Sequence, residues 1–257
     1  MKVGKGSSKL GAAVEKEILE TELGPVIIKR RKGRRRLSIV LHPRRPIEVR
    51  SNLKMSHQQI KIFLLEKKDW IEKNQNKFQN QKEKFPEKKF EDGEAFPLLG
   101  KTRSLKMVQG LNKKVSVRFD GNFIILAIPV LPVEDSKIVQ SFRDLYKKVS
   151  VAYLQQRVQA LSARMNCQPT ELSFGEAKSL WGSCHQSGHV RLNWKLIVFE
   201  PEIIDYVVIH ELAHLKFLNH SARFWNWVEQ FEPDFQNIRR KLKESEALVA
   251  FLERPKL

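Results

Sequence analysis

The sequence has few cysteines and no long apolar run, and both absences narrow the class of protein. Two cysteines among 257 residues, Cys167 and Cys184, do not make the disulfide framework of a small secreted protein. No stretch reaches the roughly 18 consecutive apolar residues that a membrane-spanning helix needs. The beginning of the chain lacks the apolar core of a secretory signal. We therefore expect a reduced, cytoplasmic protein without a membrane partner.

Acidic residues are scarce, and the deficit lies in the first two thirds of the chain. The formal net charge is +18, from 47 Lys and Arg against 29 Asp and Glu. Residues 1–100 carry 24 bases against 13 acids, residues 101–170 carry 12 against 4, and residues 171–257 carry 11 against 12. This asymmetry suits a polyanion such as nucleic acid or a nucleotide, bound through basic residues 29–36. A basic surface that serves solubility alone fits equally well.

The apolar pattern divides the chain into three regions. Residues 1–22 are polar and predict a flexible lead-in. Residues 23–132 combine short β-rich runs with one amphipathic helix over about 56–79, which predicts a β-rich basic N-terminal region. Residues 133–257 begin with a long amphipathic helix and are mainly helical. Because strands and helices are partly segregated, the expected fold class is α+β.

Two turn signals predict hairpins in the β-rich region. The basic run and Gly33 separate the apolar runs 26–28 and 37–41, as in a hairpin. An Asp-Gly turn at Asp120-Gly121-Asn122 separates the runs 115–119 and 123–128.

The sequence His210-Glu211-Leu212-Ala213-His214 lies in a helical pattern that Pro201 opens. A helix turns about 100° per residue, so His210 and His214 project from one face and both imidazoles can reach one ion. Glu211 lies beside that face and can contact a metal-bound water. This spacing indicates a zinc site. The competing interpretation is an amphipathic helix with ordinary surface and core histidines.

His220 is the candidate third ligand, although it lies six residues after His214. On a continuing helix it would face about 240° away, so it can join the site only if the helix ends first. Asn219 tolerates the left-handed conformation that ends helices, and Ser221 is a good N-cap for a new helix. We therefore expect one Zn²⁺ ion on three histidines, with an open position for water. Glu211 would take a proton from that water as the catalytic base. Another divalent ion could replace zinc.

Around this helix the chain resembles the YgjP-like metallopeptidase family, relatives of the SprT-like zincins. The resemblance spans about residues 179–235 and rests on Trp181-Gly182-Ser183-Cys184, Gly188, Leu192-Asn193-Trp194, Pro201, Asp205-Tyr206-Val207-Val208, the HExxH sequence, Asn219-His220-Ser221 and Phe224-Trp225. Weaker matches are Arg34-Arg35-Arg36 and Pro97-Leu98-Leu99-Gly100. It implies a zincin-like metallohydrolase core over residues 133–257, zinc on the three histidines and Glu211 as the base.

The resemblance also implies that the loop Trp181–Cys184 runs beside the metal. Ser183 or backbone amides there could stabilise an oxyanion, while Trp181 is expected to support the metal helix by packing. Cys184 is either a metal-proximal thiol or an ordinary buried cysteine. Three further residues are candidate substrate contacts or salt-bridge partners: Arg191, Asn193 and Arg223.

Three functions agree with these features. Hydrolysis of a polypeptide follows from the HExxH chemistry and the resemblance, with Val190–Trp194 as a strand edge for the substrate. Hydrolysis of a phosphoanhydride, as in a nucleoside triphosphate, would use the basic residues, but the sequence has no glycine-rich phosphate loop and no acidic cluster for magnesium. A nucleic-acid-binding protein with a structural zinc would leave Glu211 without a purpose. The sequence favours a zinc-dependent hydrolase, and a metallopeptidase among hydrolases.

Overall fold

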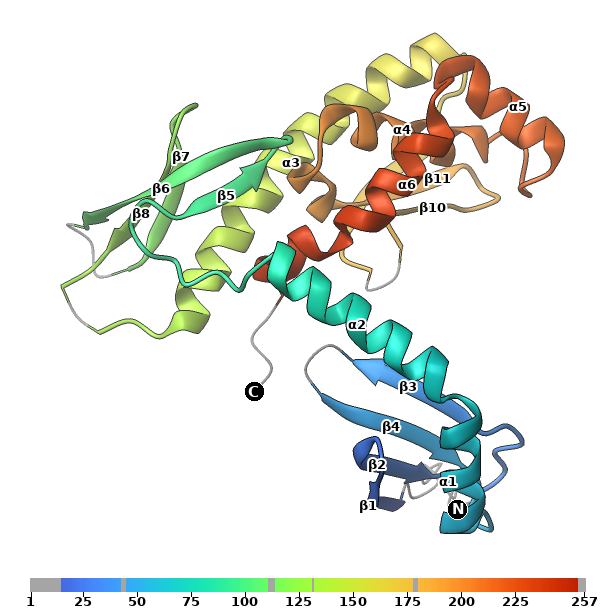
Figure 1. Ribbon diagram of the computed structural model, residues 1–257. Helices are drawn as coiled ribbons and strands as arrows, with labels where there is room; N and C mark the ends of the chain where they lie inside the picture. Colours follow the sequence, from blue (N-terminus) through green and yellow to red (C-terminus); the bar gives the residue numbers. More distant parts are fainter. Residues whose placement is uncertain (1–14, 43–44, 111–113, 131, 178–179, 254–257) are drawn as a thin grey trace, which may run out of the picture. The chain divides into compact units, whose positions relative to one another are not determined.

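The computed structural model describes residues 15–42, 45–110, 114–130, 132–177 and 180–253. The chain divides into two compact units, residues 1–86 and 87–257. Helices and strands are mixed, and the N-terminal part is rich in strands (Figure 1), as the predicted α+β class requires. Among the described residues, no helix combines the length and the apolar character needed to cross a bilayer.

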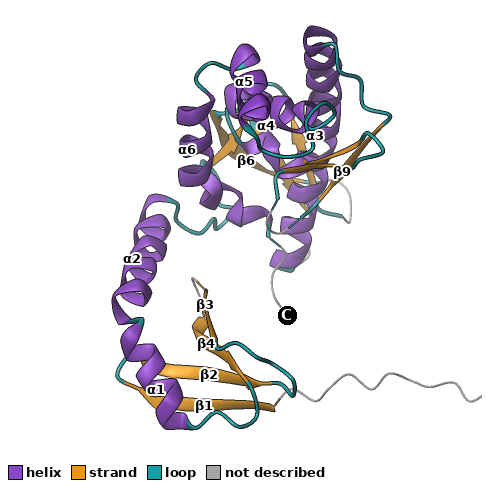
Figure 2. Ribbon diagram, turned by 90° about the vertical axis from the view of Figure 1, so that its right-hand side faces the viewer, coloured by secondary structure: helices purple, strands orange, loops and turns teal. Residues whose placement is uncertain are grey.

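A four-stranded sheet and two helices form the N-terminal unit. The strands are β1 (Glu15–Thr21), β2 (Gly24–Arg30), β3 (Ser38–His42) and β4 (Arg45–Ser51), in the order β1-β2-β4-β3. Strand β2 pairs antiparallel with β1 and parallel with β4. The helices α1 (His57–Glu66) and α2 (Lys68–Lys84) follow the sheet (Figure 2). A separate apolar core holds the unit together, made by Val26, Ile28, Ile47, Val49, Ile60, Leu64 and Ile71.

Three expectations for this unit are corrected. Residues 15–21 belong to the expected flexible lead-in, but they form β1. A two-residue turn pairs β1 with β2, and Thr21 Oγ1 donates a hydrogen bond across it to the carbonyl oxygen of Gly24 at 2.7 Å. Residues 1–14 lie outside the described part of the chain. The basic run does not close a hairpin, because β4, and not β3, is the neighbour of β2. The helix expected over 56–79 is two helices that meet at Lys67.

The C-terminal unit begins with a second four-stranded sheet. Its strands are β5 (Ala95–Leu98), β6 (Lys101–Gln109), β7 (Ser116–Phe119) and β8 (Ile124–Ile128), in the order β5-β6-β8-β7. The turn predicted between β7 and β8 is present, because Asp120 Oδ1 accepts hydrogen bonds from the amides of Asn122 and Phe123. Gly121 has a φ of +100°, a conformation that glycine adopts readily.

The long helix α3 (Asp135–Met165) joins this sheet to the rest of the unit. It packs against β7, and Tyr146 Oη donates to the carbonyl oxygen of Pro97 in β5 at 2.9 Å. Asn166 ends the helix in the left-handed conformation. Strands β5 to β8 therefore belong to the same compact unit as α3, whereas the sequence pattern places a boundary between residues 132 and 133.

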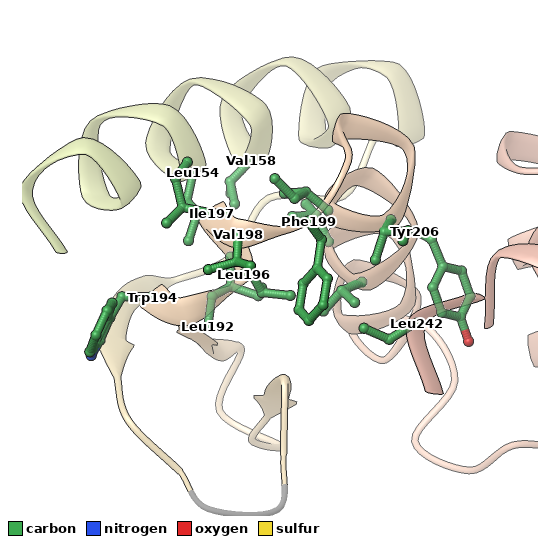
Figure 3. Packing of buried hydrophobic residues seen from close by; sticks show 14 of the residues in the cluster. Leu154, Val158, Leu192, Trp194, Leu196, Ile197, Val198, Phe199, Tyr206 and Leu242 are labelled. Atoms are coloured by element: carbon green, nitrogen blue, oxygen red, sulfur yellow. The ribbon is translucent and has the colours of Figure 1, made fainter. Parts of the chain in front are cut away.

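The remaining elements carry the histidines. Strands β9 (Glu171–Gly175), β10 (Gly182–Cys184) and β11 (His189–Asn193) form a sheet in the order β10-β11-β9. After the short 3₁₀ helix η1 (Trp194–Val198) come α4 (Pro201–Ala213), α5 (Ala222–Phe231), α6 (Phe235–Ser245) and η2 (Glu246–Leu252). Figure 3 shows Leu154 and Val158 of α3 packed with Ile197 and Val198 of η1. The buried residues of α4 belong to the same apolar core, which holds that helix in place.

Candidate metal centre

Three histidines converge at the C-terminal end of α4. His210 lies in the last turn of that helix, His214 is its C-cap, and His220 lies in the segment that leads to α5. Each offers a ring nitrogen within 4.8 Å of the other two. Nε2 of His210 and Nε2 of His220 are 3.0 Å apart. The structure thus brings together the three histidines that the sequence singles out.

Helix α4 ends at Ala213, before Asn219, which was the residue expected to end it. The amides of Leu215, Lys216 and Phe217 bond back to the carbonyls of Leu212 and Ala213, which forms a tight turn. Asn219 is not among the described residues with a left-handed φ. Ser221 is the N-cap of α5, but its side chain makes no capping hydrogen bond. The break that His220 requires is present, and the turn after His214 makes it.

These nitrogens fit a divalent ion such as zinc. Nδ1 of His214 is 3.0 Å from the carbonyl oxygen of Phe217, which orients the ring and leaves Nε2 for a ligand bond, as in many metal-binding histidines. Two nitrogens at about 2.0–2.1 Å from one tetrahedral zinc lie about 3.3 Å apart, close to the separation of His210 and His220. Burial lowers the pKa of His210 to about 3, helped by the charges of His214 and His220. Its imidazole is therefore neutral, as a ligand must be.

Aromatic rings surround the histidines. The buried ring of Phe224 lies 5.0, 4.6 and 4.8 Å from the rings of His210, His214 and His220. The indole of Trp225 stacks on His220 at 5.5 Å. The sequence pattern marks Phe224 and Val228 as the apolar face of α5, but nothing in it places that face under the histidines.

Glu211 is buried between α4 and strand β10. Only 6% of its surface is exposed. A Cβ atom at Gly182 would lie 2.5 Å from Cγ of Glu211 and 2.7 Å from its Oε1. Burial raises the pKa of the Glu211 carboxyl to about 8. Among the described residues, no hydrogen bond or ion pair engages this carboxyl group, so it is available for chemistry.

The two faces of β10 differ in what they contact. Gly182 faces Glu211, and side chains alternate along a strand. Cys184 shares that face, and burial together with the charge of Glu211 raises the pKa of its thiol. Ser183 is paired with Arg191 on the opposite, exposed face. The Ser183 hydroxyl is thus directed away from Glu211. Of the two kinds of oxyanion donor expected from this loop, only its backbone amides can then serve. Cys184 lies beside Glu211 but outside the histidine cluster.

The side chain of Asn193 holds backbone segments together. Its side chain is buried, and its Nδ2 donates to the carbonyl oxygens of Ala177 and Leu180 at 3.0 and 3.1 Å. Its Oδ1 accepts from the amide of Lys195 at 3.1 Å. These bonds use the amide group to hold the segment before β10, which leaves no free group for a substrate.

The two arginines named as candidate contacts make no described contact with the histidines. The guanidinium of Arg191 crosses Gly175, where a Cβ atom would lie 2.2 Å from its Nε. Arg223 is exposed in the first turn of α5, and no described contact joins it to the cluster. Trp181 packs edge-on against Phe199 at 4.9 Å, the supporting role expected for it.

Asp205 ties α4 to α3. Its two carboxylate oxygens accept hydrogen bonds from Nε and Nη2 of Arg157, each at 2.7 Å. Such a two-point pair fixes orientation as well as distance. Asp205 thus positions the metal helix and does not contact the histidines.

The two described hollows of this unit do not contain the histidines. One, of about 750 Å³, lies between β7 and α3. The other, of about 120 Å³, is lined by Gly182 and Ser183 of β10 together with Gly175 and Arg191. In the cluster itself, His210 and His214 are half-buried and His220 is exposed.

Comparisons with known proteins identify the family of this chain. The sequence model described as YgjP-like, metallopeptidase domain, matches residues 35–245. The chain is similar to two solved structures of metallopeptidase zymogens. Jannalysin of Methanocaldococcus jannaschii has 21% identity and a TM-score of 0.34, with 36% of this chain and 96% of that chain covered. Abylysin of Pyrococcus abyssi has 24% identity and a TM-score of 0.33, with 36% and 95% covered. No curated protein matches. Because the family match spans most of its length, this chain belongs to the YgjP-like metallopeptidase family.

Proposed function

We propose that this protein is a zinc-dependent peptidase in which Glu211 is the general base. The observation that carries the proposal is the convergence of three imidazoles beside a buried carboxyl group without a partner among the described residues. Membership of a metallopeptidase family implies a hydrolase with a divalent metal. Structural zinc sites are closed by four protein ligands, whereas catalytic sites have three and an open position. The described residues supply three, which favours catalysis over a structural zinc.

The chain's own residues account for the proton transfers. An ion held by the histidines would acidify water, polarise a carbonyl oxygen and favour the ionised form of Glu211. Glu211 then takes a proton at a carboxylate oxygen from the water whose oxygen forms a bond to the carbonyl carbon. The peptide C–N bond breaks, and Glu211 returns the proton to the leaving amine. Burial alone raises the pKa of Glu211 to about 8, and a cation on the histidines would lower it towards the range in which a carboxylate accepts and returns a proton near neutral pH.

A polypeptide has a strand edge available beside this carboxyl group. Residues Val190–Trp194 were expected to provide the edge, but Val190–Asn193 lie in β11, the central strand between β10 and β9, so that expectation is corrected. Strand β10 has one neighbour in the described sheet, and Gly182 brings its backbone against Glu211. An extended peptide that pairs with the outer edge of β10 would pass directly by the catalytic base.

The test compares the wild type with Glu211→Gln, both loaded with zinc. We expect each to bind about one zinc ion, and the wild type to cleave an unfolded protein such as reduced casein. The variant should lose activity by about 10²–10⁴-fold, the usual contribution of a general base. Nucleoside triphosphates form the second substrate arm. Hydrolysis of triphosphates alone would replace the peptidase by a phosphoanhydride hydrolase, and zinc-loaded wild type that cleaves neither substrate contradicts the proposal.

We also propose that nucleic acid binds the N-terminal unit through part of the basic run. Lys29 forms an ion pair with Glu48, and the buried Arg30 pairs with Glu17, each at 2.6 Å. These two cations are therefore neutralised within the protein. Four others are exposed, and the described structure gives none of them an ion pair: Arg31, Lys32, Arg35 and Arg36. Such unpaired cations on one loop are suited to phosphate contacts.

A further inference from the structure

A third helix places a cation next to the histidine cluster. Arg239 lies in α6, and its guanidinium carbon is 5.4 Å from the centre of the Trp225 ring. The same indole stacks on His220 at 5.5 Å and lies 5.7 Å from the ring of His210. One indole therefore separates the Arg239 guanidinium from two of the metal-binding histidines.

The indole is itself held firmly. Trp225 is stacked on Phe235 at 5.2 Å with an angle of 13° between the planes, and it meets Phe224 edge-on at 5.0 Å. Phe224 and Phe235 are both buried. A guanidinium that lies over a fixed ring is pre-organised by that contact.

A further aromatic residue, Tyr206, borders the histidines. Tyr206 is four residues before His210 on the same face of α4, with the two rings 6.0 Å apart. Figure 3 shows the Tyr206 ring beside Leu242 of α6.

Arg239 has no carboxylate of its own. Its side chain is exposed, and within the described residues it forms no ion pair. Its neighbour Arg240 is different, because its Nη2 donates to Oδ1 of Asn237 at 3.0 Å and no aromatic contact joins it to the cluster. Arg239 is thus an unneutralised cation beside the metal centre, and Arg240 is an arginine of the same helix without that placement.

We propose that Arg239, in cation–π contact with Trp225, forms a subsite that binds a carboxylate of the peptide substrate beside the bond to be cleaved. The inference rests on the proposed peptidase function and assigns that site a specificity. A guanidinium presents a planar fork of N–H donors that matches the two oxygens of a carboxylate. A peptide offers this group in two places, at its C-terminus and in the side chains of Asp and Glu.

The experiment uses the zinc-loaded full chain and matched peptides. One set differs only in a free or amidated C-terminus, and another has Glu or Gln at the positions next to the cleaved bond. We expect the wild type to prefer one carboxylate form by about tenfold in kcat/KM, mainly through KM, because a charge-assisted hydrogen bond contributes about that much. The set that shows the preference identifies the source of the carboxylate.

Variants test whether Arg239 causes the preference. Arg239→Gln should abolish it, Arg239→Lys should keep part of it, and Arg239→Glu should turn it towards peptides with Lys. Arg240→Gln, the matched control, should keep the full preference. Zinc content and the thermal midpoint should stay unchanged in all four variants, because both arginines are exposed. A preference that survives in Arg239→Gln, or a wild type that cleaves both forms equally, would overturn the subsite.

A binding measurement separates this proposal from the peptidase proposal. Fluorescently labelled peptides are titrated into zinc-loaded Glu211→Gln, with and without Arg239→Gln. Tighter binding of the carboxylate form that depends on Arg239 supports the subsite even if the wild type cleaves no peptide, in which case the peptidase proposal fails alone. Equal dissociation constants for all forms overturn the subsite even if cleavage is observed.

Discussion

Glu211 can be buried against strand β10 because Gly182 of that strand has no side chain. A Cβ atom at position 182 would lie 2.5 Å from Cγ of Glu211, far inside van der Waals contact. Only a glycine therefore allows strand β10 to lie directly on the carboxyl group. The sequence Trp181-Gly182-Ser183-Cys184 thus includes one residue whose small size the buried position of Glu211 requires.

Gly182→Ala should reduce activity more than stability. The added methyl group must displace Glu211 or β10, and overpacking of this kind costs about 1–3 kcal/mol. We expect kcat/KM for peptide cleavage to fall by about 10²-fold, because small displacements of catalytic groups have effects of that size. Peptide assays, zinc content and urea unfolding provide the measurements. Ser183→Ala, whose side chain is on the other face of β10, is the control and should behave as the wild type. Unchanged activity in Gly182→Ala would show that the close approach does not matter.

His220→Ala should lose zinc without loss of the fold. Removing even an outer partner of a ligand weakens metal binding by about 10–100-fold, so loss of a ligand should cost more than about 100-fold. His220 is exposed, so the metal-free stability should change by no more than about 0.5 kcal/mol. Competition with a chelating dye measures the affinity. His185→Ala, an exposed histidine outside the cluster, should bind zinc normally. Equal zinc affinity in both variants would remove His220 from the ligand set.

Phe224 should be important for both stability and metal affinity. Its buried ring contacts all three histidine rings, so Phe224→Ala leaves a cavity that costs about 3–5 kcal/mol. Phe224→Leu keeps most of the volume and should cost less. Denaturant unfolding with and without zinc separates the two effects, because zinc stabilises the folded state in proportion to its affinity. If Phe224→Leu binds zinc normally while losing stability, the ring supports the fold but does not orient the histidines.

Acid should weaken the contact between α3 and the segment around Glu176. Its carboxylate pairs with Arg143 and lies 2.9 Å from Nζ of Lys195. Burial alone would raise its pKa, but the hydrogen bonds and charges of Arg143 and Lys195 lower it from 4.5 to about 2. A lowered pKa gives stability that is fully present above pH 4.5 and is lost as the pH falls towards 2.

Glu176→Gln should therefore reduce the free energy of unfolding near neutral pH but not near pH 2. After allowance for solvent screening of this partly exposed group, we expect a loss of about 1–2 kcal/mol at pH 7. Urea unfolding across this pH range measures it. Glu229→Gln, an exposed residue of α5 that forms no ion pair in the described structure, is the control. A pH-independent difference between Glu176→Gln and the wild type would contradict the assigned linkage.

The basic loop should bind DNA in a salt-dependent manner. The variant has Gln in place of four residues: Arg31, Lys32, Arg35 and Arg36. Its affinity for DNA should be lower, and the slope of log K against the logarithm of the salt concentration should be less steep by up to about four. Each phosphate contact contributes about one to that slope. Fluorescence anisotropy with a labelled duplex measures both quantities. The control replaces four exposed lysines of α1 and α2 or their junction, with the same change of charge: Lys61, Lys67, Lys73 and Lys77. Equal losses in both variants would indicate net charge and not a specific loop.

Patterns within a short stretch of sequence predicted the helices and turns that interactions within the same stretch stabilise. The apolar spacing over 134–166 predicted α3, and Asn166 ends that helix in a left-handed conformation. The Asp-Gly turn predicted the pairing of β7 with β8. Strand order was not predictable in this way, because the parallel pairing of β2 with β4 joins segments far apart in the chain. The same reason explains why residues 190–194 read as a free edge although β11 is flanked on both sides.

The sequence by itself determined that His210 and His214 share one helix face, because the helical repeat alone sets that geometry. It also indicated that the helix must break before His220, although the turn after His214, and not Asn219, makes the break. The tertiary structure decided the rest of the centre. Gly182, Phe224 and Arg239 come from β10, α5 and α6. Their contacts with Glu211, the histidines and Trp225, respectively, depend on how those elements pack on a common core. Packing of distant segments follows from the burial of apolar surface over the whole unit, which no short stretch of sequence encodes.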